Sequence, residues 1–338
     1  MKFKNFSQRL KSNKLKTYYL SLKSYLAKVF VSNKLNADAL NSPFFIVATP
    51  GSLHLVKLCL KLIPEDQEVV LVLNGLEHWE RKWVERNLRT SGLISLPFVL
   101  NHDQVIDYLL NWMDKPFGLL DYDCFVFSKD CFRDIKNINE KTSISAYYGT
   151  LNDKLGIVFP ETFFVFINTP VLKKLAKKYG VNSKIIKWDD LSLLAKEKMQ
   201  ELGIDRHLLP ESRKNYFDTL RALMVLALLE DYQFGFPPAG FINYMEEQPD
   251  DLFHVGSTFG VPYYGAKTTS PYRARGAYFW YRALEQVDDK GIKQRYYEKY
   301  GKWSKEKLLK QFSLPEEKIC EFITEIENVI NRSNNSNQ

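Results

Sequence analysis

The sequence lacks an apolar run long enough to cross a bilayer, and it has few cysteines. Its longest uninterrupted apolar stretch, residues 222–229, is shorter than the roughly 18–20 residues of a membrane span and predicts a buried core helix instead. The N-terminus also lacks the continuous apolar segment of a signal peptide. The cysteines show no metal-ligand spacing and have apolar neighbours, which predicts buried free thiols in a reducing compartment: Cys59, Cys124, Cys131 and Cys320.

Acidic residues are absent from positions 1–37, which carry nine lysines and arginines. Without this segment the net charge of +7 would be close to zero, so we do not expect the rest of the protein to bind nucleic acid. Apolar residues recur at helical spacing over residues 15–30, which predicts a basic amphipathic helix. Residues 1–34 are expected either to contact an anionic membrane surface or to pack on their own domain with the lysines in water. A lysine-rich N-terminal segment without acidic residues is also similar to an organelle transit peptide, although arginine is the expected basic residue in such peptides.

The first half of the sequence has the pattern of an α/β protein. A hydrophobic fraction of 45% with 26% charged residues is typical of a globular protein with a sizeable core. Short apolar runs alternate with amphipathic segments, which predicts strands at 44–48, 68–73, 96–100 and 117–120 and helices at 53–63, 79–88 and 104–113. This alternation predicts a mainly parallel sheet covered on both faces.

The second half of the sequence is less regular and has no internal repeats. It predicts an aromatic strand, two helices, a loop rich in glycine, proline and tyrosine, and a capped final helix, at 161–167, 170–179, 215–230, 234–271 and from 313 onwards. We expect four parts: a basic helical arm at 1–41, a catalytic domain at 42–290, a helical C-terminal extension at 291–332 and a disordered tail at 333–338.

Two aspartates follow the predicted strand at 117–120. Asp121 and Asp123 leave the sheet at its carboxyl edge, which is where open α/β sheets bind ligands. Two carboxylates there suit Mg²⁺ or Mn²⁺ bridging a diphosphate, because these cations prefer oxygen ligands. The alternative is that one aspartate caps the following turn and the other is solvated.

This segment resembles the DxD signature of the metal-dependent, nucleotide-sugar-using glycosyltransferases with the GT-A fold. Further short motifs extend the resemblance over residues 43–284. It implies a GT-A-like α/β fold, in which a Rossmann-like nucleotide-binding half has a mixed central sheet. It also implies that Asp121 and Asp123 hold Mn²⁺ or Mg²⁺, and that Asp121 contacts the donor.

The resemblance assigns further donor contacts. Four residues lie where such enzymes place the loop after the first strand, which cradles the base and ribose: Thr49, Pro50, Gly51 and Ser52. Asn74 falls where the second strand ends, beside the base. His254, in a glycine-flanked loop, looks like the third metal or diphosphate ligand; the alternative is a loop histidine bonded to backbone. The other histidines are assigned no role: His54, His78, His102 and His207.

Cations downstream of His254 are candidates for neutralising the leaving diphosphate. Lys267, Arg273 and Arg275 stand among tyrosines and glycines, and cations on a closing loop can stabilise the charge of a leaving group. The alternative is a surface loop with solvated arginine head groups.

Inverting transfer requires a base for the acceptor hydroxyl. Asp218 is one candidate, because an acid there resembles an acceptor-side position of the GT-A fold. Asn215 could instead cap a helix in which Asp218 favours the helix dipole. Glu161 is the second candidate, whereas retaining transfer requires no such base.

The sequence thus predicts transfer of a sugar from a nucleotide-sugar donor, expected to be UDP-linked, to a hydroxyl of a glycan or lipid-linked acceptor. The expected location is the cytoplasm, with peripheral membrane contact through residues 1–34 as one alternative. A DxD phosphohydrolase is a competing hypothesis, but it would have Thr or Val where Phe125 stands. The loop after the first strand is too short and uncharged for a nucleotide-sugar pyrophosphorylase. A catalytically degenerate assembly protein is a further alternative.

Overall fold

The computed structural model describes residues 22, 32–33, 35–205, 216–237, 242–243, 250–256, 258–259, 261–262, 271–302 and 316–335. The predicted N-terminal helix lies almost entirely outside these residues, as does Lys267, so both interpretations stay predictions. Among the described residues, no helix combines the length and apolar character needed to cross a bilayer.

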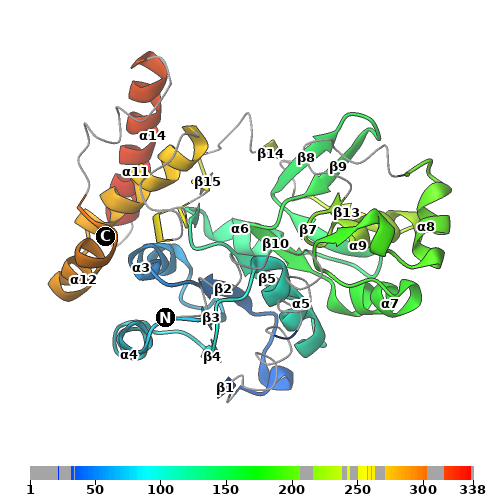
Figure 1. The fold of residues 1–338 in the computed structure, drawn as a ribbon, viewed down its shortest axis with the longest axis horizontal. Coiled ribbons are helices and arrows are strands. Elements are labelled where there is room, and N and C mark those ends of the chain that lie inside the picture. The colour runs from blue at the N-terminus through cyan, green and yellow to red at the C-terminus, as the bar shows by residue number, and fades with distance from the viewer. Residues whose placement is uncertain are drawn as a thin grey trace.

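A mixed eight-stranded sheet forms the centre of the fold (Figure 1). Its order is β1-β4-β3-β2-β5-β10-β7-β13. In that order the strands are Ser32–Asn33, Gly92–Leu96, Val69–Asn74, Phe44–Ala48, Phe117–Leu120, Phe164–Ile167, Thr142–Ala146 and Gln233–Gly235. The four strands from β4 to β5 are parallel, whereas β10 is antiparallel to both β5 and β7. The predicted α/β fold with a mixed, mostly parallel central sheet is confirmed.

The central strands are apolar along their whole length because helices cover both faces of the sheet. Alternate side chains of β2 enter two different cores: Phe44 and Ile46 belong to one, and Phe45 and Val47 to the other. The first core includes side chains of α3 (Leu53–Leu62), α11 (Pro271–Glu285) and α14 (Glu316–Asn335). The second includes those of α5 (His102–Trp112), α7 (Thr169–Tyr179) and α9 (Arg221–Leu229).

The remaining elements extend this core at two ends. Figure 1 shows α11, α12 and α14 gathered at one end of the molecule and α7, α8 and α9 at the other. Three small sheets are separate from the central one: β14-β8-β9, β11-β12 and β15-β6. The bounds are η1 Ala37–Ala39, α4 His78–Asn87, β6 Cys124–Val126, α6 Lys129–Asp134, β8 Tyr148–Asn152, β9 Ile157–Pro160, β11 Ile186–Lys187, η2 Trp188–Asp190, α8 Leu193–Gln200, β12 Tyr216–Phe217, β14 Ile242–Asn243, β15 Leu252–His254 and α12 Lys290–Tyr300.

Three predicted elements are placed differently by the structure. The segment predicted as a loop at 234–271 contains the strands β14 and β15, which pair with β8 and β6, and His254 is the last residue of β15. The strand predicted at 96–100 is wrong: β4 ends at Leu96, because Pro97 has no N–H to continue the ladder. The helix predicted at 215–230 begins only at Arg221. Residues 216–217 pair with β11 instead, and Leu220 adopts the left-handed conformation, with φ 62°, which ends the preceding extended chain.

The C-terminal segment also differs from its prediction. Helix α14 continues to Asn335, so residues 333–335 are helical and do not belong to a disordered tail. Ser333 is buried in this last part of the helix, and its hydroxyl donates to the carbonyl of Val329. All four cysteines are free thiols as predicted, but Cys320, on α14, is exposed and the other three are buried.

Candidate functional site

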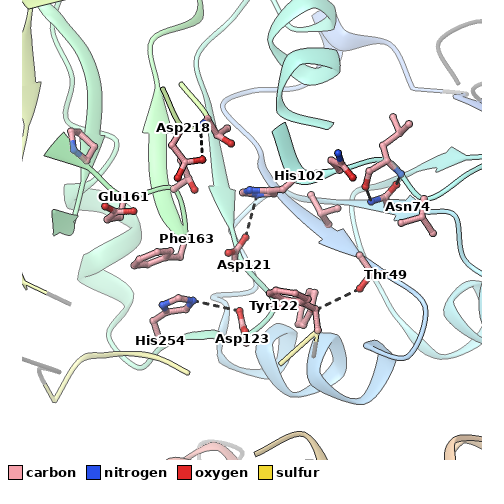
Figure 2. Close-up of a pocket in the computed structure, with 18 of the residues that line it drawn as sticks. Thr49, Asn74, His102, Asp121, Tyr122, Asp123, Glu161, Phe163, Asp218 and His254 are labelled. Carbon is pink, nitrogen blue, oxygen red and sulfur yellow. Dashed lines mark hydrogen bonds and ion pairs between the residues drawn. The ribbon is translucent and has the colours of Figure 1, made fainter. Parts of the chain in front are cut away.

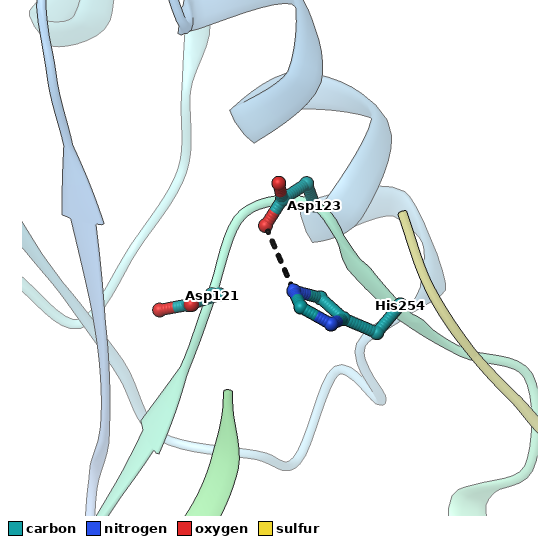
Figure 3. Close-up of side chains that lie close together, drawn as sticks. All are labelled: Asp121, Asp123 and His254. Atoms are coloured by element: carbon teal, nitrogen blue, oxygen red, sulfur yellow. Dashed lines mark ion pairs between the residues drawn. The ribbon is translucent and has the colours of Figure 1, made fainter. Parts of the chain in front are cut away.

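Asp121 and Asp123 stand on a turn that leaves β5 at the carboxyl edge of the parallel strands. The amide of Asp121 donates to the carbonyl of Phe163, which continues the pairing of β5 with β10, and the amide of Cys124 donates back to the carbonyl of Asp121. The chain therefore bends between β5 and β6. Figure 3 shows the two carboxylates separated by this bend, with the imidazole of His254 beside them.

His254 reaches this turn through strand pairing. Strand β15 is antiparallel to β6 with His254 opposite Cys124, and the amide of Val255 donates to the carbonyl of Asp123. This register brings Nε2 of His254 to 3.7 Å from Oδ1 of Asp123 (Figure 3). Residues far apart in the sequence are thus joined by backbone hydrogen bonds.

The three side chains have the chemistry and spacing of a metal site. One ligand atom each from Asp121, Asp123 and His254 lies within 4.8 Å of the other two. Two ligands about 2.1 Å from one cation are roughly 3.0 Å apart at right angles and roughly 4.2 Å apart on opposite sides, so the three atoms must move closer together to bind one ion. Two carboxylates and one imidazole fit Mn²⁺ or Mg²⁺ and leave positions for a ligand's oxygens.

Neighbouring side chains fix the orientation of two of these ligands. The hydroxyl of Thr258 donates to Oδ2 of Asp123 at 2.8 Å. The ring of Phe163 stacks on the imidazole of His254, with centroids 3.8 Å apart and planes at 13°. Such backing contacts hold metal ligands in one geometry.

The two carboxylates differ in their electrostatics. Burial, together with the negative charge of Asp123, raises the pKa of Asp121 to about 7. Burial opposes ionisation of Asp123 too, but the imidazole of His254 and the hydroxyl of Thr258 outweigh it and keep its pKa below the usual value. Asp123 therefore holds the negative charge of the pair, and a cation would draw the proton from Asp121.

A cavity of about 560 Å³ opens over these residues (Figure 2). Seven residues singled out in the sequence line it: Thr49, Asn74, Asp121, Asp123, Glu161, Asp218 and His254. Figure 2 shows Asn74 and Glu161 on opposite sides of Asp121. The cavity therefore has two ends, with the candidate metal ligands between them.

The loop at residues 49–52 contributes only Thr49 to the cavity wall. Ser52 is buried, and its hydroxyl caps the turn by bonding the amide and carbonyl of Thr49. The backbone of Gly51, which has φ 88°, forms hydrogen bonds to residues that do not line the cavity. Its amide donates to Glu80, and its carbonyl accepts from the indole of Trp280. Pro50, Gly51 and Ser52 are not among the cavity-lining residues, so their donor contacts stay a prediction.

Asn74 supports the neighbouring loop. Its Nδ2 donates to the carbonyl of Leu100 and its Oδ1 accepts from the amide of Leu100, at 2.9 and 2.7 Å. These bonds fix the segment that leads into α5, where Asn101 and Gln104 form a capping box. The segment presents His102 to the cavity.

The structure does not bring the predicted arginines to the cavity. Arg273 and Arg275 lie on α11 and are absent from the cavity lining. Arg275 forms an ion pair with Glu325 of α14 at 3.2 Å and stacks over Phe253. Their contact with the donor diphosphate stays a prediction.

Among the basic residues that line the cavity, two were not identified from the sequence. His102 places Nε2 3.6 Å from Oδ1 of Asp121, and Arg221 lies at the Glu161 end. For His102 the signal was its place at the start of a capped helix after a parallel strand. Arg221 had no such signal, since its approach depends on the left-handed Leu220 before it.

Both candidate bases line the cavity. Glu161 accepts a 2.7 Å hydrogen bond from the hydroxyl of Thr150 and faces Arg221 at 3.4 Å. Asp218 lies ahead of α9, not inside its first turn, so the expectation that it favours a helix dipole from position N3 is wrong. Its Oδ1 accepts from the amide of Thr219. A choice between the two as base stays a prediction.

Comparison with known proteins gives a match to a glycosyltransferase family model. Residues 28–172 match the family model described as the StrH glycosyltransferase N-terminal domain. A curated relative, the dTDP-dihydrostreptose–streptidine-6-phosphate dihydrostreptosyltransferase of Streptomyces griseus, is 28% identical over 90 residues, which are 27% of this chain and 23% of the relative. The match thus spans less than a quarter of that relative's length.

Solved structures with a similar chain course include glycosyltransferases. The glycosyltransferase GlyE of Streptococcus pneumoniae aligns with 12% identity and a TM-score of 0.40, over 78% of this chain and 65% of that one. The mannosyltransferase PcManGT of Pyrobaculum calidifontis, solved with GDP-Man and Mn²⁺, aligns with 11% identity and a TM-score of 0.37, over 84% and 77%. The sequence comparisons support a glycosyltransferase, and the matched segment carries β2 to β5 together with Asp121 and Asp123.

Proposed function

We propose that this protein is a metal-dependent glycosyltransferase that uses a nucleotide-sugar donor. The observation that carries the proposal is the convergence of Asp121, Asp123 and His254 in one cavity at the carboxyl edge of the sheet. A bound Mn²⁺ or Mg²⁺ would neutralise the diphosphate of the donor and so stabilise it as a leaving group. On the side of Thr49 and Asn74, the cavity would take the nucleoside.

The transfer requires one bond to form and one to break. The oxygen of the acceptor hydroxyl bonds to the anomeric carbon of the donor sugar, and the bond from that carbon to the diphosphate oxygen breaks. The nucleoside diphosphate leaves with the electron pair. In an inverting reaction Glu161 or Asp218 takes the hydroxyl proton, because both carboxylates line the cavity beyond the candidate metal ligands.

The donor and acceptor classes follow from the proposal. The resemblance to GT-A enzymes favours a UDP-linked sugar, and the name of the curated relative adds dTDP-linked sugars. The acceptor is a hydroxyl of a glycan or of a lipid-linked sugar. A panel of UDP-, dTDP- and GDP-linked sugars, incubated with and without Mn²⁺, tests the donor class through release of the nucleoside diphosphate.

The decisive variant is Asp123→Ala, with Lys173→Met as a matched surface control. We expect turnover of the best donor to fall to roughly 1% or less of wild type in Asp123→Ala, and no change in the control. Unchanged turnover in Asp123→Ala would overturn the proposal. Release of inorganic phosphate from a sugar phosphate would instead support a phosphohydrolase. No turnover, with no shift in melting temperature on adding Mn²⁺ and UDP, would support a degenerate assembly protein.

A further inference from the structure

Among the described residues, one arginine and two carboxylates lie at the end of the cavity beyond the candidate metal ligands. Arg221, Glu161 and Asp218 all line it. Arg221 is fixed from behind, because its guanidinium lies over the ring of Phe159 at 4.4 Å and its Nη2 is 3.4 Å from Oε1 of Glu161. The same Glu161 oxygen accepts from the hydroxyl of Thr150. These polar groups are therefore ordered before any ligand arrives.

The charged side chains at this end of the cavity favour some classes of ligand over others. An anionic group here would meet the carboxylates of Glu161 and Asp218 as well as Arg221, and the repulsion would cancel much of the attraction. An alkyl chain would remove water from these charged groups and return no hydrogen bonds. A hydroxyl both donates and accepts, so a ring with several hydroxyls satisfies Arg221 and the two carboxylates at once.

An aromatic side chain adds apolar surface to the same cavity. Phe259 lines the cavity and is 42% exposed, which is unusual for a phenylalanine. An aromatic face of this kind suits the C–H face of a sugar ring. Hydroxyl-binding charges and an exposed aromatic ring thus occur in one cavity.

We propose that this end binds the acceptor as a neutral polyhydroxylated ring, a sugar or a cyclitol, and that Arg221 is a residue that selects it. The inference rests on the proposed glycosyl transfer and narrows the acceptor to a ring that carries hydroxyls and no charge. Arg221 contacts ring hydroxyls, while Glu161 and Asp218 accept hydrogen bonds from them.

The experiment uses the full chain, Mn²⁺ and the best nucleotide-sugar donor. Release of nucleoside diphosphate above the rate with water alone is measured with methyl hexopyranosides and myo-inositol, with myo-inositol 1-phosphate, and with octanol. Neutral polyols are expected to accelerate release most. A preference for the phosphorylated ring or for octanol overturns the inference while leaving the proposed function standing. No binding or turnover of any nucleotide sugar overturns the proposed function itself.

Variants test the part played by Arg221. Arg221→Met keeps an apolar stem over Phe159 but removes the donors, and we expect the KM for the best polyol to rise roughly 10- to 100-fold. Arg221→Lys should give an intermediate KM and Lys173→Met a wild-type KM, and calorimetric affinity for UDP with Mn²⁺ should change less than about twofold in Arg221→Met. An unchanged KM in Arg221→Met overturns the assignment.

If Arg221→Met does not fold, a set of acceptor analogues can test whether this end of the cavity binds ring hydroxyls. Deoxy forms of the best polyol are then tested with the wild-type protein. At least one deoxy form should raise KM about tenfold or more, because it lacks a hydroxyl that hydrogen-bonds to a charged group at this end. A KM that changes less than twofold for every deoxy form overturns the inference.

Discussion

The imidazole of His254 and the ring of Phe163 lie parallel, with centroids 3.8 Å apart. Phe163 is also the residue whose carbonyl accepts the amide of Asp121. One residue of the β9–β10 turn therefore touches two of the three candidate metal ligands, one through its ring and one through its backbone.

Removing the ring of Phe163 should weaken metal binding. In Phe163→Ala the imidazole of His254 loses its stacking partner and gains rotational freedom, so we expect the affinity for Mn²⁺ to fall about tenfold. Electron paramagnetic resonance titration of free Mn²⁺ measures this directly. Leu193→Ala, at a position 71% exposed on α8, is the control and should bind as wild type does. Equal affinities in Phe163→Ala and wild type would show that the stack does not orient the ligand.

His102 should support the candidate metal site by orienting the carboxylate of Asp121. Its Nε2 is shielded from solvent, has no hydrogen-bond partner among the described residues, and faces Oδ1 of Asp121 at 3.6 Å. When a cation ionises Asp121, a small approach lets Nε2 donate to that oxygen and orient the carboxylate. We expect His102→Ala to lower Mn²⁺ affinity about tenfold and His102→Gln, which keeps a donor, to recover part of the loss. A lower melting temperature with unchanged affinity in both variants would mean that His102 only packs.

The parallel half of the sheet could be predicted because its strands are continuous apolar runs. Strands β2 and β5 occur at the predicted residues, since 44–48 and 117–120 are apolar and bounded by turn residues. Strand β4 was misplaced because Gly92–Leu96 includes a glycine and a serine, whereas the apolar residues after Pro97 look more like a strand. The strand propensity of an apolar segment does not show whether that segment pairs with another strand of the sheet.

The candidate site was predictable to the extent that it depends on strand ends. Asp121 and Asp123 come directly after a buried strand, so their place at the sheet edge follows from local sequence. The approach of His254 depends on the pairing of β15 with β6, and that of Arg221 on one left-handed residue. Such tertiary relationships leave no periodic signal in the sequence. Arg275 illustrates the reverse case, since its local setting resembled a diphosphate clamp but its partner is Glu325.

A substitution at Asn74 can show whether this residue contacts the nucleotide or supports the neighbouring loop. The resemblance to GT-A enzymes gives Asn74 a contact with the nucleotide, whereas in the structure its side chain forms two hydrogen bonds to the backbone of Leu100. In Asn74→Leu both backbone groups lose a buried partner, so we expect the free energy of unfolding to fall by about 2–4 kcal/mol. Urea unfolding followed by circular dichroism gives this value. Unchanged stability together with weaker UDP binding would instead favour the nucleotide contact.

His54 should make the free energy of unfolding depend on pH. His54 is buried, and its Nε2 donates to the carbonyl of Trp280 at 2.9 Å, while Nδ1 is buried with no hydrogen-bond partner in the described part of the chain. Burial lowers the pKa of His54 to about 3, although the Trp280 carbonyl partly offsets this. In the unfolded chain the pKa is about 6.5. The unfolded state therefore binds more protons between these values, and stability is present above pH 6.5 and lost as the pH falls below it.

The loss should approach about 1.4 kcal/mol per pH unit below pH 6.5, or about 2 kcal/mol between pH 7 and pH 5. His54→Gln keeps a donor for Trp280 but does not titrate, so the difference between wild type and variant isolates this contribution from that of the carboxylates. Urea unfolding at several pH values between 5 and 8 measures it, with His78→Gln, at an exposed position on α4, as the matched control. Parallel stability curves for wild type and His54→Gln would contradict the prediction, because they would mean that the imidazole takes up its proton as readily in the folded core as in the unfolded chain.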